Sequence, residues 1–173
     1  MSKKARIITL VLIVLSLVVT LTACGLKDQI DGLGQEIKPN NDEKQVTIIV
    51  GEKTFEVTTT KAYLHEALKD LLAEGKIALY EYGSDESPYV VAIDVLEQDV
   101  EGGKYFSVWH NVDSFSLKCI WSDFVPSRAL KTTDNDGNIV VTTMHKNQEL
   151  FYSGVGIGTL PLVDGCTYAI LVD

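Results

Sequence analysis

The residue with the most clearly defined chemistry is Cys24, which lies in the sequence Leu-Thr-Ala-Cys-Gly at residues 21–25. The chain before it begins with three basic residues, Lys3, Lys4 and Arg6, and continues with a mainly apolar run over residues 7–21. Basic charge, a short apolar stretch and small residues at a cleavage point are typical of an export signal. We therefore predict a lipoprotein signal peptide over 1–23, with diacylglycerol attached to the thiol of Cys24.

The alternative for residues 7–21 is a transmembrane anchor. This run is shorter than the roughly 20 apolar residues that a spanning helix needs, and a lipid-modified cysteine gives stable anchoring through two acyl chains. We expect a lipid-anchored protein at the cell membrane that faces the extracytoplasmic side. Its one defined partner is then the membrane itself, through the lipid.

Candidate catalytic and metal-binding residues are sparse. The three histidines, His65, His110 and His145, lie in no motif that supplies the hydrogen-bonded partner a catalytic base needs. The acidic segment 134–138 cannot be an EF-hand loop, because Thr132 and Thr143 would occupy positions that require Asp and Glu. An Asp-Gly tight turn explains it better. We predict no catalytic residue, no metal site and no cofactor.

The glycines at 154, 156 and 158 alternate with apolar residues, but Thr159-Leu160-Pro161 follows them. A phosphate-binding loop would need a lysine and a helix at that point. We expect these glycines to allow close approach of the backbone.

Aromatic residues are the best candidates for ligand binding. Tyr105, Trp109, Trp121 and Phe124 lie on or near two predicted strands, where their rings could stack on a ligand or anchor a partner. The alternative is that these rings fill the core of a small domain.

Composition restricts the class of partner. The chain has 15 Lys and Arg against 24 Asp and Glu, a net charge of −9. Cleavage before Cys24 would remove three basic residues and no acidic ones, which leaves 12 against 24, a net charge of −12. Such a surface repels nucleic acid. The two remaining cysteines, Cys119 and Cys166, could form a disulfide or stay as separate buried thiols.

The pattern of apolar residues predicts one domain behind a tether. Residues 24–44 are polar and glycine-containing, which indicates a flexible tether after the lipidated cysteine. Residues 45–173 form the predicted extracytoplasmic domain. It begins with a β-hairpin over 46–58, followed by a helix whose apolar stripe is Leu64, Leu68, Leu71 and Leu72. Thr59 or Thr60 could cap this helix, and Gly75 ends it.

The rest of the domain is predicted to be mainly strands. They cover residues 77–82, 89–96, 104–112, 115–121, 138–144, 149–152 and 167–172. The stretch 126–130 is irregular. The sequence therefore predicts an α+β domain with one helix and a small sheet.

Three segments together resemble a known family. They are the hairpin and helix over 46–72, the aromatic strand 105–111, and the ending 154–168 with its Gly-Val-Gly-Ile-Gly-Thr-Leu-Pro-Leu sequence. In this order they resemble the bacterial surface-lipoprotein domain of unknown function that is similar to the C-terminal domain of transcobalamin. The resemblance implies a β-grasp-like fold, with a small mixed sheet and one packed helix. In the family, the aromatic strand is followed closely by the glycine-containing ending. Here residues 112–152 lie between the two, and they predict an inserted β-hairpin region.

The resemblance transfers no ligand contact to this chain, although the related transcobalamin domain covers one face of a corrinoid. We expect a non-catalytic binding or interaction module for a small ligand. The alternative is a structural accessory protein that binds another cell-surface protein, and an enzyme is the third possibility. A concave aromatic pocket would favour the first, and clustered ionisable groups in a cleft would favour the third.

Overall fold

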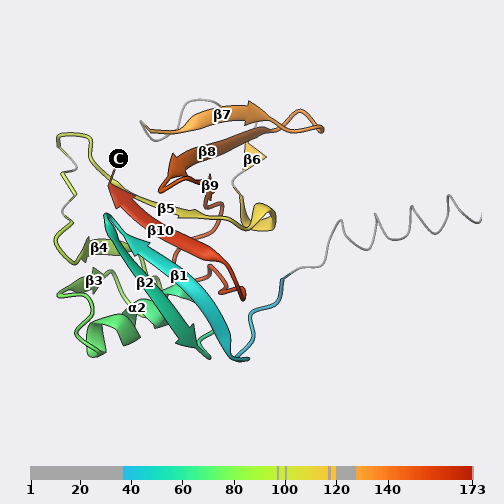
Figure 1. Cartoon of the computed structure of the whole chain (residues 1–173). Helices are drawn as coiled ribbons and strands as arrows, with labels where there is room; N and C mark the ends of the chain where they lie inside the picture. The colour runs from blue at the N-terminus through green and yellow to red at the C-terminus, as the bar shows by residue number, and fades with distance from the viewer. Residues whose placement is uncertain (1–36, 97, 100, 117, 120–127, 173) are drawn as a thin grey trace, which may run out of the picture. The chain divides into compact units, whose positions relative to one another are not determined.

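The computed structural model describes residues 37–172, except for 97, 100, 117 and 120–127. Cys24 and the predicted signal peptide therefore lie outside the described residues. The described part is a mixed α+β structure in which strands dominate and α2 (Leu64–Ala73) is the one α-helix (Figure 1). No helix in this part of the chain has both the length and the apolar character needed to cross a membrane.

The main sheet has the strand order β2-β1-β10-β5-β9-β8-β6, with β7 also paired to β8. β1 and β10 run parallel, and the other described pairs are antiparallel. The bounds are β1 Lys44–Val50, β2 Lys53–Thr59, β5 Phe106–His110, β6 Lys118–Cys119, β7 Leu130–Thr133, β8 Ile139–His145, β9 Gln148–Tyr152 and β10 Thr167–Val172. A separate two-stranded sheet pairs β3 (Tyr80–Tyr82) with β4 (Val90–Ile93).

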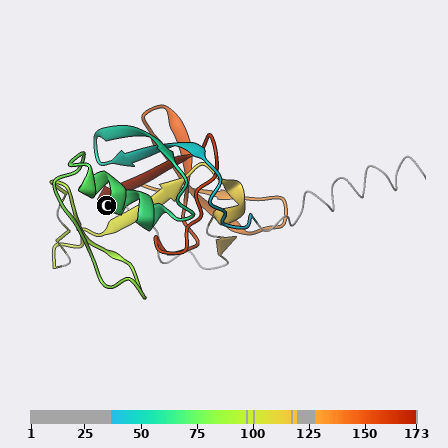
Figure 2. The ribbon, with the colours of Figure 1, turned by 90° about the horizontal axis from the view of Figure 1, so that it is seen from below.

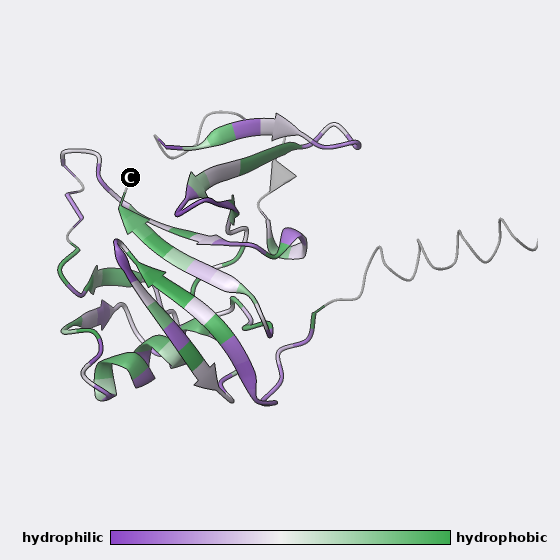
Figure 3. Ribbon diagram, viewed as in Figure 1, coloured by the Kyte–Doolittle hydropathy of each residue, from purple (hydrophilic) through white to green (hydrophobic). Residues whose placement is uncertain are grey.

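Side chains along the central strands point alternately into two hydrophobic cores, one on each face of the sheet. In β1, Val46, Ile48 and Val50 join the larger core under α2, whereas Ile49 joins a smaller core on the opposite face. β10 divides in the same way, because side chains of a strand alternate between its faces. Both faces of β10 and of residues 48–50 in β1 are therefore buried, which explains the continuous apolar residues there (Figure 3).

The predicted helix is confirmed, and it lies against one face of the sheet (Figure 2). Leu64, Leu68 and Leu71 are buried in the larger core, while Leu72 at the edge of the stripe is partly exposed. Gly75 ends the helix as predicted. It adopts a left-handed conformation, with φ +69°, that an L side chain would strain.

The predicted cap of this helix is wrong. Tyr63, rather than Thr59 or Thr60, occupies the N-cap position. Glu66 stabilises this end of the helix by a different contact: its carboxylate accepts the backbone N–H groups of Ala62 and Tyr63, each at 3.1 Å. A glutamate at the third helical position commonly performs this task.

The segment 153–163 completes the first turn of the helix. The N–H of Leu64 donates to the carbonyl of Leu160, and the N–H of His65 donates to the carbonyl of Ile157. These two donors have no partner within a helix. The segment with the alternating glycines therefore fixes where α2 begins.

Region 112–152 contains more structure than one inserted hairpin. β8 and β9 form the predicted hairpin, but β7 falls where the sequence predicts no strand. The predicted strand over 115–121 is confirmed in part by the two-residue β6 and is wrong at Phe115, which belongs to a short 3-10 helix, Asp113–Phe115. Residues 117, 120 and 121 lie outside the described residues. The Asp-Gly turn between β7 and β8 is confirmed, with Asp134 accepting the backbone N–H groups of Asp136 and Asn138.

Candidate functional site

The predicted aromatic candidates do not form one cluster. Tyr105 is 48% exposed and lines a groove beside β5. Trp109 is fully buried in the smaller core, where its indole N–H donates to the hydroxyl of Ser107 at 2.7 Å. Trp121 and Phe124 lie outside the described residues. Of the four candidates, Tyr105 is the one that the structure places in a hollow of the surface.

We call this hollow the aromatic groove. It has a volume of about 480 Å³. Three tyrosine rings line it, those of Tyr89, Tyr105 and Tyr152, and Tyr89 is 60% exposed. The other lining residues are Pro88, Val90, Gln98, Phe106, Val108, Ser153, Gly154, Val155, Gly156 and Ile157. None of the described residues in this lining carries a carboxylate, ammonium, guanidinium or imidazole group.

Strand β5 and the start of segment 153–163 form the floor of the aromatic groove. The N–H of Ser153 donates to the carbonyl of Val108, and the N–H of Gly154 donates to the carbonyl of Phe115. The Ser153 hydroxyl donates to the carbonyl of Val155 at 2.7 Å. These bonds fix the backbone, so this part of the groove is formed before any ligand arrives.

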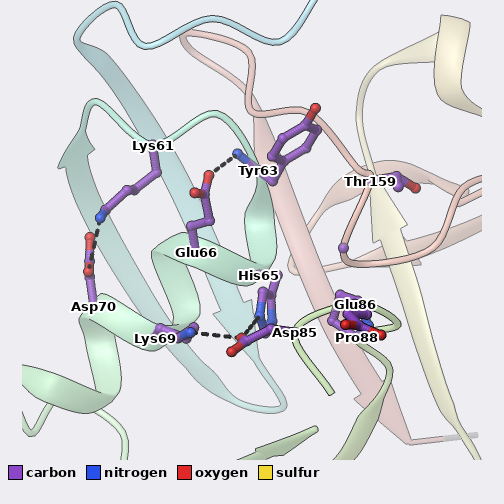
Figure 4. Close-up of a pocket in the computed structure, with 11 residues that line it drawn as sticks. Lys61, Tyr63, His65, Glu66, Lys69, Asp70, Asp85, Glu86, Pro88 and Thr159 are labelled. Carbon is purple, nitrogen blue, oxygen red and sulfur yellow. Dashed lines mark hydrogen bonds and ion pairs between the residues drawn. The ribbon is translucent and has the colours of Figure 1, made fainter. Parts of the chain in front are cut away.

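A second hollow, the His65 cleft, has a volume of about 440 Å³ (Figure 4). It is lined by Lys61, Tyr63, His65, Glu66, Lys69, Asp70, Asp85, Glu86, Pro88, Gly158 and Thr159. The cleft is thus rich in ionisable groups, in contrast to the aromatic groove. Two ion pairs occupy much of it. Lys69 lies 2.9 Å from Asp85, and Lys61 lies 3.6 Å from Asp70.

His65 is the buried member of this cleft, with a side chain only 8% exposed. Its Nδ1 lies 2.8 Å from the hydroxyl of Tyr80, and its ring meets the ring of Tyr82 edge-on. Its Nε2 is buried and has no hydrogen-bond partner, but it faces Asp85 Oδ1 at 3.6 Å. Figure 4 shows His65 and Lys69 both directed at Asp85.

Burial and the charge of Asp85 shift the pKa of His65 in opposite directions. Burial lowers the pKa of His65, and the neighbouring Asp85 partly restores it. Lys69 lowers the pKa of the Asp85 carboxyl and is itself shifted to a higher pKa by that carboxylate. At neutral pH the cleft therefore holds a neutral imidazole next to an ionised Lys69–Asp85 pair.

The sequence did not identify this cluster. His65 and Lys69 are one turn apart on α2, which is a visible signal, but Tyr80 and Asp85 come from the following strand and loop. Only the packing of β3 against the helix brings the four groups together. The burial of His65 is a finding of the structure.

Other reactive groups are not gathered into a site. Cys166 is a free thiol whose pKa is raised by burial, which disfavours the reactive thiolate. The side chain of Cys119 lies outside the described part. Among the described residues, no group of three or more His, Cys, Asp or Glu side chains is placed to hold a metal ion.

One loop separates the two hollows. Residues 83–89, which we call the 83–89 loop, carry Asp85 and Glu86 into the His65 cleft and Tyr89 into the aromatic groove. Pro88 lines both hollows and packs against Gly158, where an added Cβ would lie 2.0 Å from the proline ring. The absence of a side chain at Gly158 thus allows this close approach.

Comparison with known proteins gives no match for this chain among family models, curated proteins or solved structures.

Proposed function

We propose that this protein is a lipid-anchored, extracytoplasmic binding module whose domain takes a neutral ligand with a flat apolar face into the aromatic groove. The observation that carries the proposal is the lining of this groove. Three tyrosine rings line it, and none of its described lining residues carries a charged side chain, although the chain as a whole is strongly acidic. Rings of this kind stack on flat apolar faces, and their hydroxyl groups remain available for hydrogen bonds.

A β-grasp-like fold is part of the proposal. It is supported by a β1–β2 hairpin, a helix that follows it directly, and a last strand that runs parallel to β1. β5 lies antiparallel beside that last strand. This order agrees with the family resemblance of the three sequence segments. The groove lies beside β5 and is lined in part by the segments that flank this strand and β9.

Ligand binding can be tested by calorimetric titration of the purified protein with two neutral probes. We expect a linear oligosaccharide of N-acetylglucosamine to bind, because each sugar ring presents a flat apolar face. Cyanocobalamin is the second probe, chosen because of the family resemblance. Tyr105→Ala should weaken binding about tenfold, since it removes one stacking ring worth roughly 1.4 kcal/mol.

Met144→Ala is the matched control, because Met144 is similarly exposed but lies on β8 outside the groove lining. It should leave affinity unchanged. Equal binding by wild type and Tyr105→Ala would contradict the groove assignment. If neither probe binds and a cell-surface protein does so through residues outside the groove, the interaction-protein alternative replaces this proposal.

Membrane anchoring gives an independent prediction. Cys24→Ala should abolish lipid attachment and the cleavage before residue 24, because the alanine has no thiol to take diacylglycerol. Membrane fractionation and mass spectrometry of the N-terminus measure both effects. Cys166→Ala is the control, since that thiol lies within the domain, and it should leave processing intact. An unchanged N-terminus in Cys24→Ala would contradict the lipoprotein proposal.

A further inference from the structure

The unpartnered nitrogen of His65 is the starting observation. The side chain is more than nine-tenths buried, Nδ1 is engaged by Tyr80, and Nε2 has no hydrogen-bond partner. The carboxylate oxygen that faces it, Asp85 Oδ1, lies 3.6 Å away, which is too long for a hydrogen bond. A buried polar atom in this state needs an explanation.

Protonation would change the balance in this cluster. An imidazolium donates from both nitrogens, and the hydroxyl of Tyr80 can rotate to accept from Nδ1. The second donor then faces the carboxylate of Asp85. A charge-assisted hydrogen bond has a length of about 2.7–2.9 Å, so the carboxylate would move by somewhat less than 1 Å toward His65.

The other charges near His65 permit this movement. On α2, Glu66 favours the imidazolium and Lys69 opposes it. On β3, burial raises the pKa of Tyr80, so this phenol stays neutral. From segment 153–163, the carbonyl of Ile157 is already bonded to the backbone N–H of His65. Oδ1 of Asp85 accepts from Lys69 and is also the oxygen that faces His65 Nε2. A carboxylate oxygen has two lone pairs, so it can accept from His65 without releasing Lys69.

The 83–89 loop can transmit the movement because it is closed on itself. The N–H of Gly83 donates to the carbonyl of Tyr89 at 3.1 Å, and the N–H of Ser87 donates to the hydroxyl of Ser84 at 3.1 Å. The ring of Tyr89 lies directly on Gly83, where an added Cβ would be 2.0 Å from a ring carbon. A displacement of Asp85 therefore reaches Tyr89 within a single bonded unit.

We propose that His65 is a pH-dependent switch, which we call the latch. When His65 is protonated, it binds Asp85 and holds the 83–89 loop against α2. The loop in turn sets the position of Tyr89, which lines the aromatic groove. The movement of the loop does not require a ligand. Only its last consequence, tighter binding at acidic pH, rests on the proposed function. The latch closes below pH 6.5, because burial keeps the imidazole neutral until the solution is more acidic than the ordinary His pKa.

The test is NMR of the full-length protein in detergent micelles, with labelled histidine and tyrosine, between pH 7.5 and 5. In the wild type, the Tyr89 resonances should shift with the same midpoint as the His65 ring. Asp85→Asn should lower the His65 midpoint and abolish the Tyr89 shift. This exposed substitution retains the size of the side chain and is not expected to unfold the domain. Lys69→Met should raise the midpoint, because it removes the opposing charge.

Glu86→Gln is the matched control, since it removes a neighbouring loop carboxylate, and Tyr89 should still follow His65 in it. A Tyr89 signal that does not follow His65, or a His65 midpoint that Asp85→Asn leaves in place, overturns the latch. If Tyr89 titrates together with His65 but neither probe binds, the latch is supported and the proposed function is contradicted. Binding of the oligosaccharide with equal affinity at pH 7.5 and 5 overturns the predicted effect of the latch on affinity, whereas the NMR titration decides the movement of the loop.

Discussion

Replacement of Trp109 by alanine should lower the free energy of unfolding by about 3–5 kcal/mol, the usual cost of removing a large buried aromatic side chain. Trp109 is fully buried among residues of β1, β8, β9 and β10, and its ring meets Tyr152 edge-on. The substitution leaves a cavity and also removes the indole N–H that binds Ser107. Urea unfolding followed by circular dichroism measures the effect.

Two controls separate packing from other causes. Trp109→Phe retains much of the apolar volume and should cost clearly less than the alanine variant. Leu130→Ala truncates an exposed side chain on β7 and should change stability by no more than about 0.5 kcal/mol. A Trp109→Ala variant as stable as wild type would mean that this residue is not in the core.

Acidification from pH 6.5 to pH 4 should cost about 3 kcal/mol of stability through His110 alone. Burial lowers the pKa of His110 to about 4, against 6.5 when unfolded. The N–H of Val112 donates to Nδ1, so the neutral ring carries its proton on Nε2, which faces the carbonyl of Phe115 at 3.2 Å. Protonation of Nδ1 would oppose the Val112 donor.

The direction of this pH effect follows from the difference between the folded-state and unfolded-state pKa values of His110. Because the folded-state pKa is lower, the contribution of His110 is complete above pH 6.5 and is lost as the pH falls toward 4. The pKa values of His65 and His145 are also lowered by burial and add to the total slope. The measurement is therefore the difference between wild type and His110→Gln in urea unfolding at several pH values. Equal slopes for the two proteins would contradict the prediction.

The local elements could be predicted because local patterns determine them. The hairpin of β1 and β2 follows from alternating apolar residues around a short turn, and its bounds agree closely with the structure. The end of α2 follows from Gly75. β7 was missed because its residues, Leu130–Thr133, are all exposed and show no alternation.

The candidate site was less predictable than the local elements, because it depends on which segments pack over each face of the sheet. Alternation placed Trp109 on one face of β5, but it could not show that residues of β8 and β9 bury that face. Tyr105, one of the predicted candidates, lies beside a groove, but the Tyr89 and Tyr152 that share this groove come from other segments of the chain. The His65 cleft depends on the fold of the 83–89 loop, which carries no recognisable motif.

The parallel pairing of β1 with β10 has a consequence for how the protein is made. Thr47 pairs with Thr167, so 120 residues separate partners at the centre of the sheet. Contacts this distant in sequence are slow to form, and the ribosome supplies β10 after every other described strand. A nascent chain that lacks β10 cannot complete either core. The domain should therefore fold only after β10 has been synthesised, and a deletion of residues 167–172 should prevent both cores from forming.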